Sequence, residues 1–314
     1  MKITKQRINY VLDLLSYCRP DRSKSEARFI REYLLSVPTA RSDAFGNVHV
    51  DLRTLPTHRT LFVAHTDTVH HAGGFQSVWY DCKAQLVRTR GQCLGADDGA
   101  GILVLLNLIR NAIPAYYIFT RGEERGGKGA RYLAETDYRL LEHFDRAIAF
   151  DRRGTSSVIT HQSYGRTCSD TFADALSDVL SNDTLMYGPD STGVYTDTAE
   201  FLDIIPECTN VSVGYVSEHS PAETLSIPHL FDLMAQTVLV PWDELPTARD
   251  PYALEPASDL WGHGSSLYGP DFWTQNPSTP STSKTPPQAE SWTEWDTDPQ
   301  TGIATAPWRK GALQ

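Results

Sequence analysis

Four short apolar runs alternate with helical patterns along the chain, and this alternation constrains the fold more than any other feature. The runs cover residues 61–64, 115–120, 146–150 and 210–215, and patterns typical of helices lie at 102–109, 130–135, 171–180 and 227–240. A short, continuously apolar strand is typical of a sheet that is covered on both faces. We therefore predict an α/β fold of three layers, α/β/α, with a mixed, mostly parallel central sheet.

The N-terminal part adds helices and strands to this pattern. Apolar residues at helical spacing predict a helix over 8–17. Ser23 and Glu26 have the spacing of a capping box, which predicts the start of a second helix that continues to residue 35. Alternating patterns predict a strand over 43–51 and an edge strand or hairpin arm over 85–90.

The overall composition limits the partners and the location of the protein. The chain has 314 residues and a formal net charge of -11, which argues against nucleic acid or an anionic membrane surface as its main partner. We see no apolar run long enough to cross a membrane and no apolar segment of a signal peptide behind the basic N-terminus. Five scattered cysteines suit a reducing compartment better than a disulfide framework, so we expect a cytoplasmic protein.

The character of the sequence changes near residue 246. We predict one folded domain over 1–245 and a C-terminal extension over 246–314 that is rich in Pro, Ser, Thr and Trp. Residues 276–314 show no periodic apolar pattern, so we expect them to be disordered and to act as a tether or a contact for a protein partner.

Imidazole and carboxylate side chains stand where the predicted strands end. These side chains are His65 and Asp67, Glu123 and Glu124, Asp151, and His219. Because open α/β sheets bind ligands at the carboxyl ends of their strands, we expect the side chains to converge on one edge of the sheet. Imidazole and carboxylate together suit zinc, and also manganese or cobalt. The sequence therefore predicts a metal site at this edge.

Two adjacent aspartates, Asp97 and Asp98, lie in a glycine-rich turn before the helix predicted at 102–109. One interpretation is a helix cap, because aspartate is a favoured cap residue and its charge suits the helix dipole. One aspartate is enough for a cap, and two neighbouring carboxylates repel each other unless a positive charge lies beside them. The second interpretation adds one of the two to the metal site.

Two metal ions that share one carboxylate account for the whole set. Asp97 would bridge ions about 3.5–4 Å apart. His65 and Asp151 would serve one ion, and Glu124 and His219 the other, with a shared position left for water or hydroxide. Alternative ligands are Asp98 for Asp97, Asp145 for Asp151, and His229 or His161 for His219.

Two further residues have roles in catalysis under this hypothesis. Asp67 would hydrogen-bond the imidazole of His65 and fix its tautomer. Glu123 would take the proton of the bridging water as general base, because its neighbours and the metals tune its pKa. Such a site would hydrolyse an amide bond, with the metals stabilising the oxyanion and Glu123 returning the proton to the leaving amine.

The order of these motifs resembles that of the co-catalytic zinc exopeptidases, which include M28 aminopeptidases, M42 aminopeptidases and M20 enzymes of the peptidase T type. The resemblance covers residues 8–240 and rests on His65-Thr66-Asp67, Gly95-Ala96-Asp97-Asp98, Glu123-Glu124, Asp151 and His219. It implies two zinc ions per chain, these five metal ligands, Glu123 as the base and a cis peptide bond after Asp97. M20 and M42 enzymes carry an inserted lid or dimerisation domain, for which the gaps between these residues leave no room. The domain therefore looks like a minimal, M28-like version.

The resemblance also implies a reaction and a substrate class. Asp at position 151 is similar to the aminopeptidase side of the superfamily, and small peptides would be the substrates. Arg152, Tyr195 and Asp197 are candidates for binding them, since Thr196-Asp197 looks like a segment that approaches substrate in these families. Arg152 or Arg153 would alternatively hold a substrate carboxylate, as in a carboxypeptidase. An N-acyl amino acid deacylase on the same scaffold, and a binding protein that keeps the fold without turnover, are the remaining alternatives.

Overall fold

The computed structural model describes residues 3–162, 165–253, 296–297 and 304–305. The chain divides into two compact units, Met1–Leu254 and Glu255–Gln314. Within the second unit, β17 (Asp296–Thr297) pairs antiparallel with β18 (Ala304–Thr305). Residues 246–253 of the predicted extension are described and belong to the first unit, and most of its other residues lie outside the described ones, so its disorder and its start at residue 246 stay predictions.

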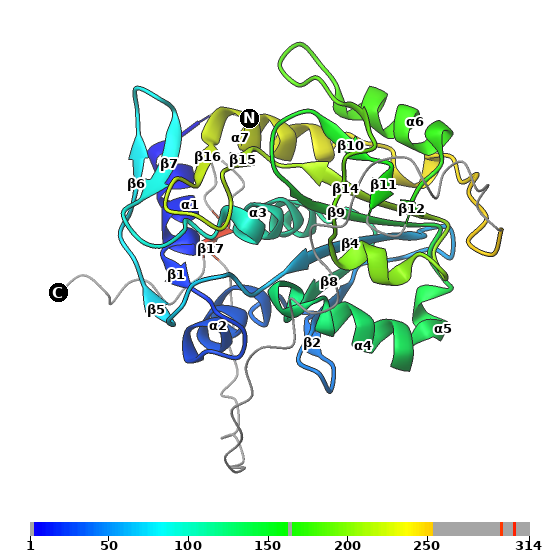
Figure 1. Cartoon of the computed structure of the whole chain (residues 1–314), viewed down its shortest axis with the longest axis horizontal. Coiled ribbons are helices and arrows are strands. Elements are labelled where there is room, and N and C mark those ends of the chain that lie inside the picture. The colour runs from blue at the N-terminus through cyan, green and yellow to red at the C-terminus, as the bar shows by residue number, and fades with distance from the viewer. Residues whose placement is uncertain (1–2, 163–164, 254–295, 298–303, 306–314) are drawn as a thin grey trace. The chain divides into compact units, whose positions relative to one another are not determined.

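An eight-stranded sheet forms the middle of the first unit (Figure 1). Its order is β13 (Gly188–Asp190), β10 (Ser157–Ile159), β14 (Glu207–Ser212), β9 (Arg146–Arg152), β4 (Thr60–His65), β8 (Tyr116–Thr120), β3 (Val48–Asp51) and β2 (Arg41–Ser42). The four central strands β14, β9, β4 and β8 run parallel to one another, and β10 and β3 pair with them antiparallel. The predicted mixed, mostly parallel sheet is confirmed.

Alternate side chains of each strand point to opposite faces of the sheet. Helices cover both faces, so the sheet separates two cores. Phe62 and Ala64 of β4 belong to the larger core, and Leu61 and Val63 belong to the smaller one. The larger core also takes residues of α1 (Lys5–Leu15), α3 (Ala96–Arg110), α6 (Asp170–Leu180) and α7 (Ile227–Thr237). The smaller core takes residues of α4 (Lys128–Thr136), α5 (Tyr138–Leu141) and the 3-10 turn η3 (Asp197–Phe201). This arrangement is the predicted α/β/α sandwich.

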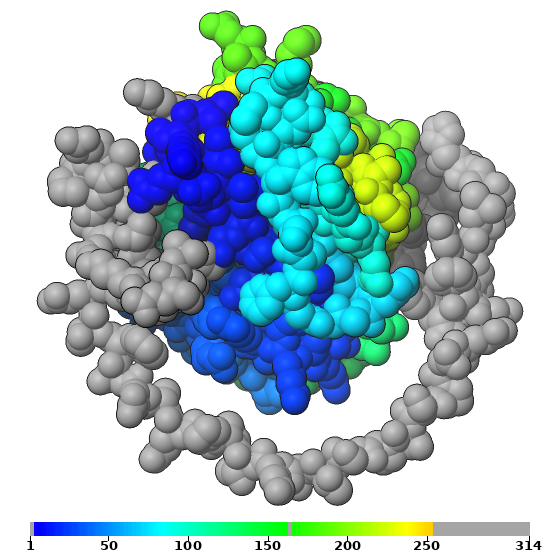
Figure 2. Space-filling view, turned by 90° about the vertical axis from the view of Figure 1, so that its left-hand side faces the viewer, coloured from blue at the N-terminus to red at the C-terminus, as the bar shows by residue number. Residues whose placement is uncertain are grey.

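Smaller elements surround the sandwich. A four-stranded antiparallel sheet joins β15 (Tyr215–Val216), β16 (Thr224–Ser226), β7 (Leu86–Thr89) and β6 (Val78–Asp81). Two-stranded pairs join β1 (Tyr17–Cys18) with β5 (Gly74–Phe75), and β11 (His161–Gln162) with β12 (Gly165–Arg166). Figure 2 shows the face on which the cyan segment with β5, β6 and β7 lies beside the blue N-terminal helices.

Several element boundaries differ from the predicted ones. The helix predicted at 102–109 already begins at Ala96, and the closing helix ends at Thr237. The strand predicted at 210–215 is two strands, because Gly214 has a φ of 101° and turns the chain between β14 and β15. The second helix is α2 (Lys24–Phe29), which continues as a π-helical turn over Ile30–Leu34.

The described residues between His65 and His219 all belong to the first compact unit, and none of them form a separate inserted domain. Among the residues that the structure describes, no helix combines the length and the apolar character needed to cross a bilayer. The short turns η2 (Glu123–Arg125) and η4 (Trp242–Glu244) complete the unit.

Candidate metal centre

The parallel strands bring the predicted ligands to one edge of the sheet. His65 is the last residue of β4, Glu123 and Glu124 follow the end of β8, and Asp151 lies near the end of β9. Because β4 pairs with both β8 and β9 in parallel, these ends are neighbours. Asp97 reaches the same edge from the first turn of α3.

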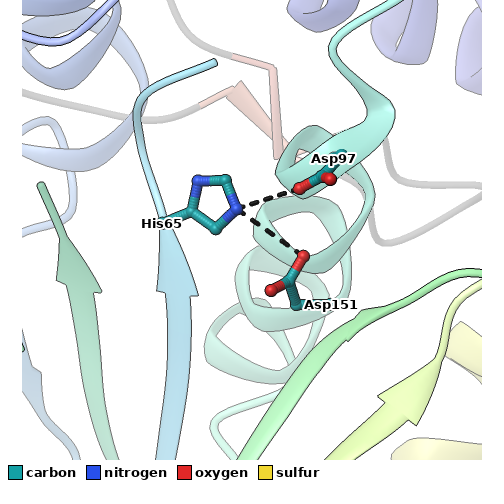
Figure 3. Close-up of side chains that lie close together, drawn as sticks. All are labelled: His65, Asp97 and Asp151. Atoms are coloured by element: carbon teal, nitrogen blue, oxygen red, sulfur yellow. Dashed lines mark hydrogen bonds and ion pairs between the residues drawn. The ribbon is translucent and has the colours of Figure 1, made fainter. Parts of the chain in front are cut away.

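His65, Asp97 and Asp151 form the first cluster (Figure 3). The Nε2 atom of His65 lies 3.0 Å from Oδ1 of Asp97 and 3.6 Å from Oδ1 of Asp151. The imidazole is 1% exposed, so its Nε2 is directed into the cluster and away from water. Such a set of one imidazole and two carboxylates is a donor set for a divalent cation.

Asp97, Glu124 and His219 form the second cluster. Nε2 of His219 lies 3.1 Å from Oδ2 of Asp97 and 3.0 Å from Oε1 of Glu124. Asp97 therefore directs one oxygen to each cluster. The peptide bond between Asp97 and Asp98 is cis, as the resemblance implied.

Glu123 lies beside both clusters. Its Oε2 is 3.9 Å from Nε2 of His65, and His65, Glu123 and Glu124 form a third group that would hold a cation. Only 12% of its side chain is exposed. The carboxylate is thus within one water molecule of the space that the two clusters enclose.

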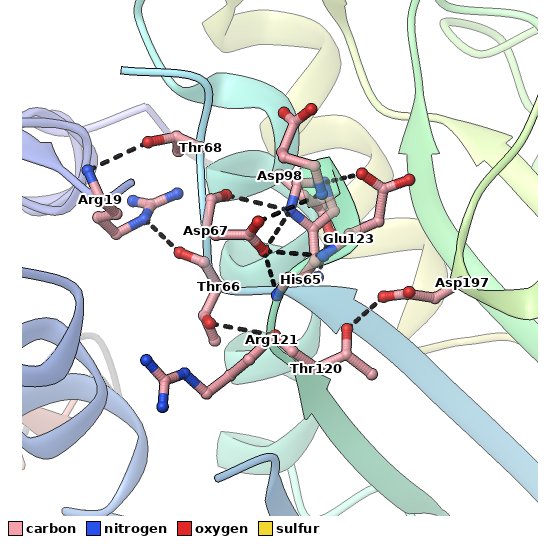
Figure 4. A network of polar contacts seen from close by, with 12 residues as sticks. Arg19, His65, Thr66, Asp67, Thr68, Asp98, Thr120, Arg121, Glu123 and Asp197 are labelled. Carbon is pink, nitrogen blue, oxygen red and sulfur yellow. Dashed lines mark hydrogen bonds and ion pairs between the residues drawn. The ribbon is translucent and has the colours of Figure 1, made fainter. Parts of the chain in front are cut away.

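Asp67 contacts both His65 and the loop of the two glutamates (Figure 4). Nδ1 of His65 lies 3.1 Å from the backbone carbonyl of Asp67, while the Asp67 carboxylate is 3.7 Å away. That carboxylate accepts the backbone N–H groups of Gly122, Glu123 and Glu124 at 2.9, 3.1 and 3.2 Å. The tautomer of His65 is set by the main chain, and the Asp67 side chain shapes the loop of the two glutamates.

The neighbouring residues Asp97 and Asp98 make different contacts. Asp98 accepts the N–H groups of Gly101 at 2.9 Å and of His65 at 3.2 Å, and it is fully buried. Asp98 is therefore the helix-capping aspartate, and the Asp97 carboxylate faces the two histidines. The cap interpretation thus fits Asp98, and Asp97 stays the candidate for the metal site.

The other alternative ligands lie elsewhere. Asp145 pairs with Arg59 at 2.7 Å before β9. His229 belongs to α7 and lies 3.0 Å from the hydroxyl of Tyr187, and His161 lies 2.9 Å from the hydroxyl of Thr160. The clusters contain none of these three residues.

The substrate candidates are placed around the clusters with partners of their own. Arg152 donates to the carbonyl and hydroxyl of Thr192 at 3.1 and 3.0 Å, and Tyr195 donates to Glu200 at 2.8 Å. Asp197 is 1% exposed and accepts the hydroxyl of Thr120. The structure thus buries Asp197, and its role in substrate binding stays a prediction.

Sequence reasoning missed the residues that hold the ligands in place. Tyr215 donates to Oδ1 of Asp151 at 3.1 Å, and Thr196 donates to its Oδ2 at 2.7 Å. Glu223 accepts backbone N–H groups at the turn of Asp97. Glu223 lies four residues after His219, but a single glutamate in a sequence does not indicate which groups its side chain contacts.

Burial and mutual repulsion shift the pKa values of the acidic groups. Burial and the nearby Asp97 charge raise the pKa of Glu124 to about 7, and burial raises that of Glu123 well above its usual range. Burial opposes ionisation of Asp97 as well, but hydrogen bonds from His219 and His65 outweigh it and hold its pKa well below the usual range. Hydrogen bonds to Asp97 and Glu124 raise the pKa of His219 to about 11. So many buried carboxylates close together need positive charge beside them, and the two clusters thus fit a pair of divalent cations.

Comparison with known proteins supports the fold. No protein-family model matches the sequence, and no curated protein matches it. Among solved structures, the aminopeptidase PepT of Bacillus cereus matches at 13% identity with a TM-score of 0.59, over 75% of this chain and 97% of that one. A tripeptidase of Staphylococcus aureus matches at 14% identity with a TM-score of 0.58, over 75% and 97%. The TET1 peptidase of Pyrococcus horikoshii, which can assemble into a tetrahedron or an octahedral shell, matches at 19% with a TM-score of 0.55, over 74% and 98%. The chain therefore has the fold of these aminopeptidases and of the tripeptidase, in agreement with the resemblance seen in the sequence.

Proposed function

We propose that this protein is a two-metal hydrolase that removes the N-terminal residue from small peptides. The observation that carries the proposal is the position of Asp97, whose two oxygens face two separate clusters, each with a histidine and a further carboxylate. His65 and Asp151 would hold one ion, Glu124 and His219 the other, and Asp97 both. Zinc suits these ligands, and manganese or cobalt are the alternatives.

The chain's own residues supply the proton transfers. Two divalent cations, when bound, would polarise the scissile carbonyl and make water a better nucleophile. Glu123 takes a proton from the attacking water, because its carboxylate lies beside the clusters and burial raises its pKa, which makes it a stronger base. The same carboxyl group then gives the proton to the leaving amine.

Features outside the clusters agree with this proposal. Arg152 is held by Thr192 and lies 3.9 Å from Asp190, so its charge already has partners and is not reserved for a substrate carboxylate. This favours the aminopeptidase over the carboxypeptidase. The five cysteines are unpaired, which supports the proposed cytoplasmic location. We also propose that the C-terminal extension contacts a protein partner, because it is rich in Pro, Ser, Thr and Trp.

The proposal is tested on the purified full chain by elemental analysis together with hydrolysis of aminoacyl-nitroanilides. We expect about two zinc, manganese or cobalt ions per chain, loss of hydrolysis with a chelator, and recovery when metal is added back. The N-acetylated form of the same substrate is the matched control, because an aminopeptidase needs the free amino group and should release no nitroaniline from it. A protein that binds no metal after reconstitution, or that cleaves equally well without it, contradicts the proposal.

A further inference from the structure

Glu223 connects the loop of His219 to the turn of Asp97. The side chain is 1% exposed. Its Oε2 accepts the N–H groups of Leu94 and Gly95 at 2.7 and 3.0 Å, and its Oε1 accepts those of Ala96 and Asp97 at 2.8 and 3.1 Å. One buried carboxylate thus satisfies four consecutive backbone donors immediately before and within the first turn of α3.

This contact changes what Asp97 is free to do. The four N–H groups of residues 94–97 precede the helical residues that Asp98 caps, and buried backbone donors of this kind need an acceptor such as a carboxylate. Glu223 supplies that carboxylate from a distant part of the chain, and Asp98 accepts the N–H of Gly101. Both oxygens of Asp97 are therefore left for His65 and His219.

We propose that Glu223 is a positioning residue for the metal pair, which sets the distance between Asp97 and His219 and so controls binding of the ion that these two residues share. The inference rests on the proposed function. His219 is 49% exposed, and Glu124 is its other partner in the cluster, so its loop needs an anchor. Glu223 anchors it to the same turn that carries the bridging carboxylate.

The Glu223→Gln variant changes this anchor with little change in shape. An amide has one acceptor oxygen, and its NH2 group would face two of the four N–H donors. The His219 loop would then move away from the turn of Asp97. We expect one ion to bind as in the wild type and the other about 10–100-fold more weakly, the usual effect of residues that orient metal ligands.

Glu207 offers a matched control. It is also fully buried, and it accepts the N–H groups of Ser169, Ala248 and Arg249 at 2.7, 2.7 and 3.0 Å. It is the first residue of β14, at the amino-terminal edge of the parallel strands, opposite the clusters. Glu207→Gln should lower the thermal stability of the metal-free protein as Glu223→Gln does, but leave the affinity for both ions unchanged.

The experiment is a Zn²⁺ titration of metal-free full-length protein by calorimetry, with thermal unfolding recorded on the same samples. Selective weakening of one ion in Glu223→Gln, and two wild-type affinities in Glu207→Gln, support the inference. Wild-type affinity for both ions in Glu223→Gln, or equal weakening in both variants, overturns it.

A second variant covers the case in which Glu223→Gln does not fold. Glu223→Asp keeps the charge, but its side chain is one methylene shorter and does not reach all four donors. We expect several-fold weaker binding of the same single ion, and unchanged affinity for both ions contradicts the inference. A wild-type protein that binds no Zn²⁺ at all contradicts the proposed function itself, which separates the two failures.

Discussion

The imidazole of His65 donates from Nδ1 to the main-chain carbonyl of Asp67 at 3.1 Å, and the carboxylate of Asp67, 3.7 Å from the same nitrogen, accepts N–H groups of the loop of the two glutamates. A carbonyl oxygen only accepts, so Nδ1 carries the proton and Nε2 is available to the cluster. The side chain of Asp67 instead determines where the metal ligand Glu124 and the proposed base Glu123 lie.

We therefore expect Asp67→Asn to act through the glutamate loop. The amide would place N–H donors against the backbone N–H groups of residues 122–124, so the loop would shift and kcat should fall about 10–100-fold. The tautomer of His65 would be kept, because the backbone carbonyl holds it. Steady-state kinetics measure the effect.

Asp81→Asn is the matched control for that prediction. Asp81 accepts the N–H groups of Lys83 and Ala84 at 3.1 Å in an exposed turn remote from the clusters, and its amide variant should keep full activity. Unchanged kcat in Asp67→Asn would show that the loop does not depend on this carboxylate.

The two neighbouring glutamates should respond differently to the same substitution. Glu123→Gln keeps the shape and loses the base, so we expect two bound ions and a fall in kcat of about 10²–10⁴-fold. Glu124→Gln weakens the ligand that lies 3.0 Å from His219, so one ion should be lost. Metal content and kcat measured on the same preparations separate the two effects. Full activity of Glu123→Gln contradicts its assignment as the base.

The location of the site was predictable because chain order and strand direction determine it together. Side chains that follow parallel neighbours such as β4, β8 and β9 must meet at one edge, and the sequence shows where each strand ends. The two roles of Asp97 and Asp98 were predictable only as alternatives, since which aspartate caps the helix depends on the path of the turn between them.

Glu223 and the backbone partners of Asp67 were not predictable, for a physical reason. Glu223 and Asp67 act through backbone N–H groups, and every residue except proline carries such a donor. The sequence therefore contains no complementary residue type that would identify the partner. Contacts of this kind are determined by the tertiary positions of loops, such as those at 94–97 and 122–124.

The stability of the metal-free protein should fall as the pH rises from 5 to 8. Burial raises the pKa of Glu124 from 4.5 to about 7, so the stability that its protonated form contributes is lost as the pH rises through 7. Hydrogen bonds raise the pKa of His219 from 6.5 to about 11, and its contribution is lost progressively over that range. The low pKa of Asp97 makes the stability rise with pH, but only below pH 5.

Bound metal ions should restore the stability that the metal-free protein loses as the pH rises. Metal ligands must be deprotonated, so affinity rises with pH. At about 100 times the dissociation constant, binding should raise the melting temperature by about 5–10 °C, more at pH 8 than at pH 5.5. Thermal unfolding with chelator and with Zn²⁺ measures this, and Glu124→Gln should make the metal-free curve flatter. A metal-free protein that is most stable at pH 8 would contradict the sign.

Arg121, which directly precedes the glutamate loop, forms an ion pair with the buried Glu26. Arg121 donates to both oxygens of Glu26, at 3.1 and 2.5 Å, and Glu26 is fully buried. Arg121→Met would leave the carboxylate without its charged partner, which should lower the free energy of unfolding by about 3–5 kcal/mol. Arg131→Met is the matched control, because the Arg131 side chain that pairs with Glu200 is 51% exposed, and it should cost about 0–1 kcal/mol.

Adding Glu26→Gln to Arg121→Met should recover part of the lost stability, since the unpaired charge is then removed from the interior. Urea unfolding of the single and double variants measures the coupling between the two residues. Arg121 also precedes the loop of Gly122 and Glu123, so the double variant should recover stability without recovering all of the activity. Recovery of neither quantity would mean that Arg121 acts through packing of its side chain, and not through the charge of Glu26.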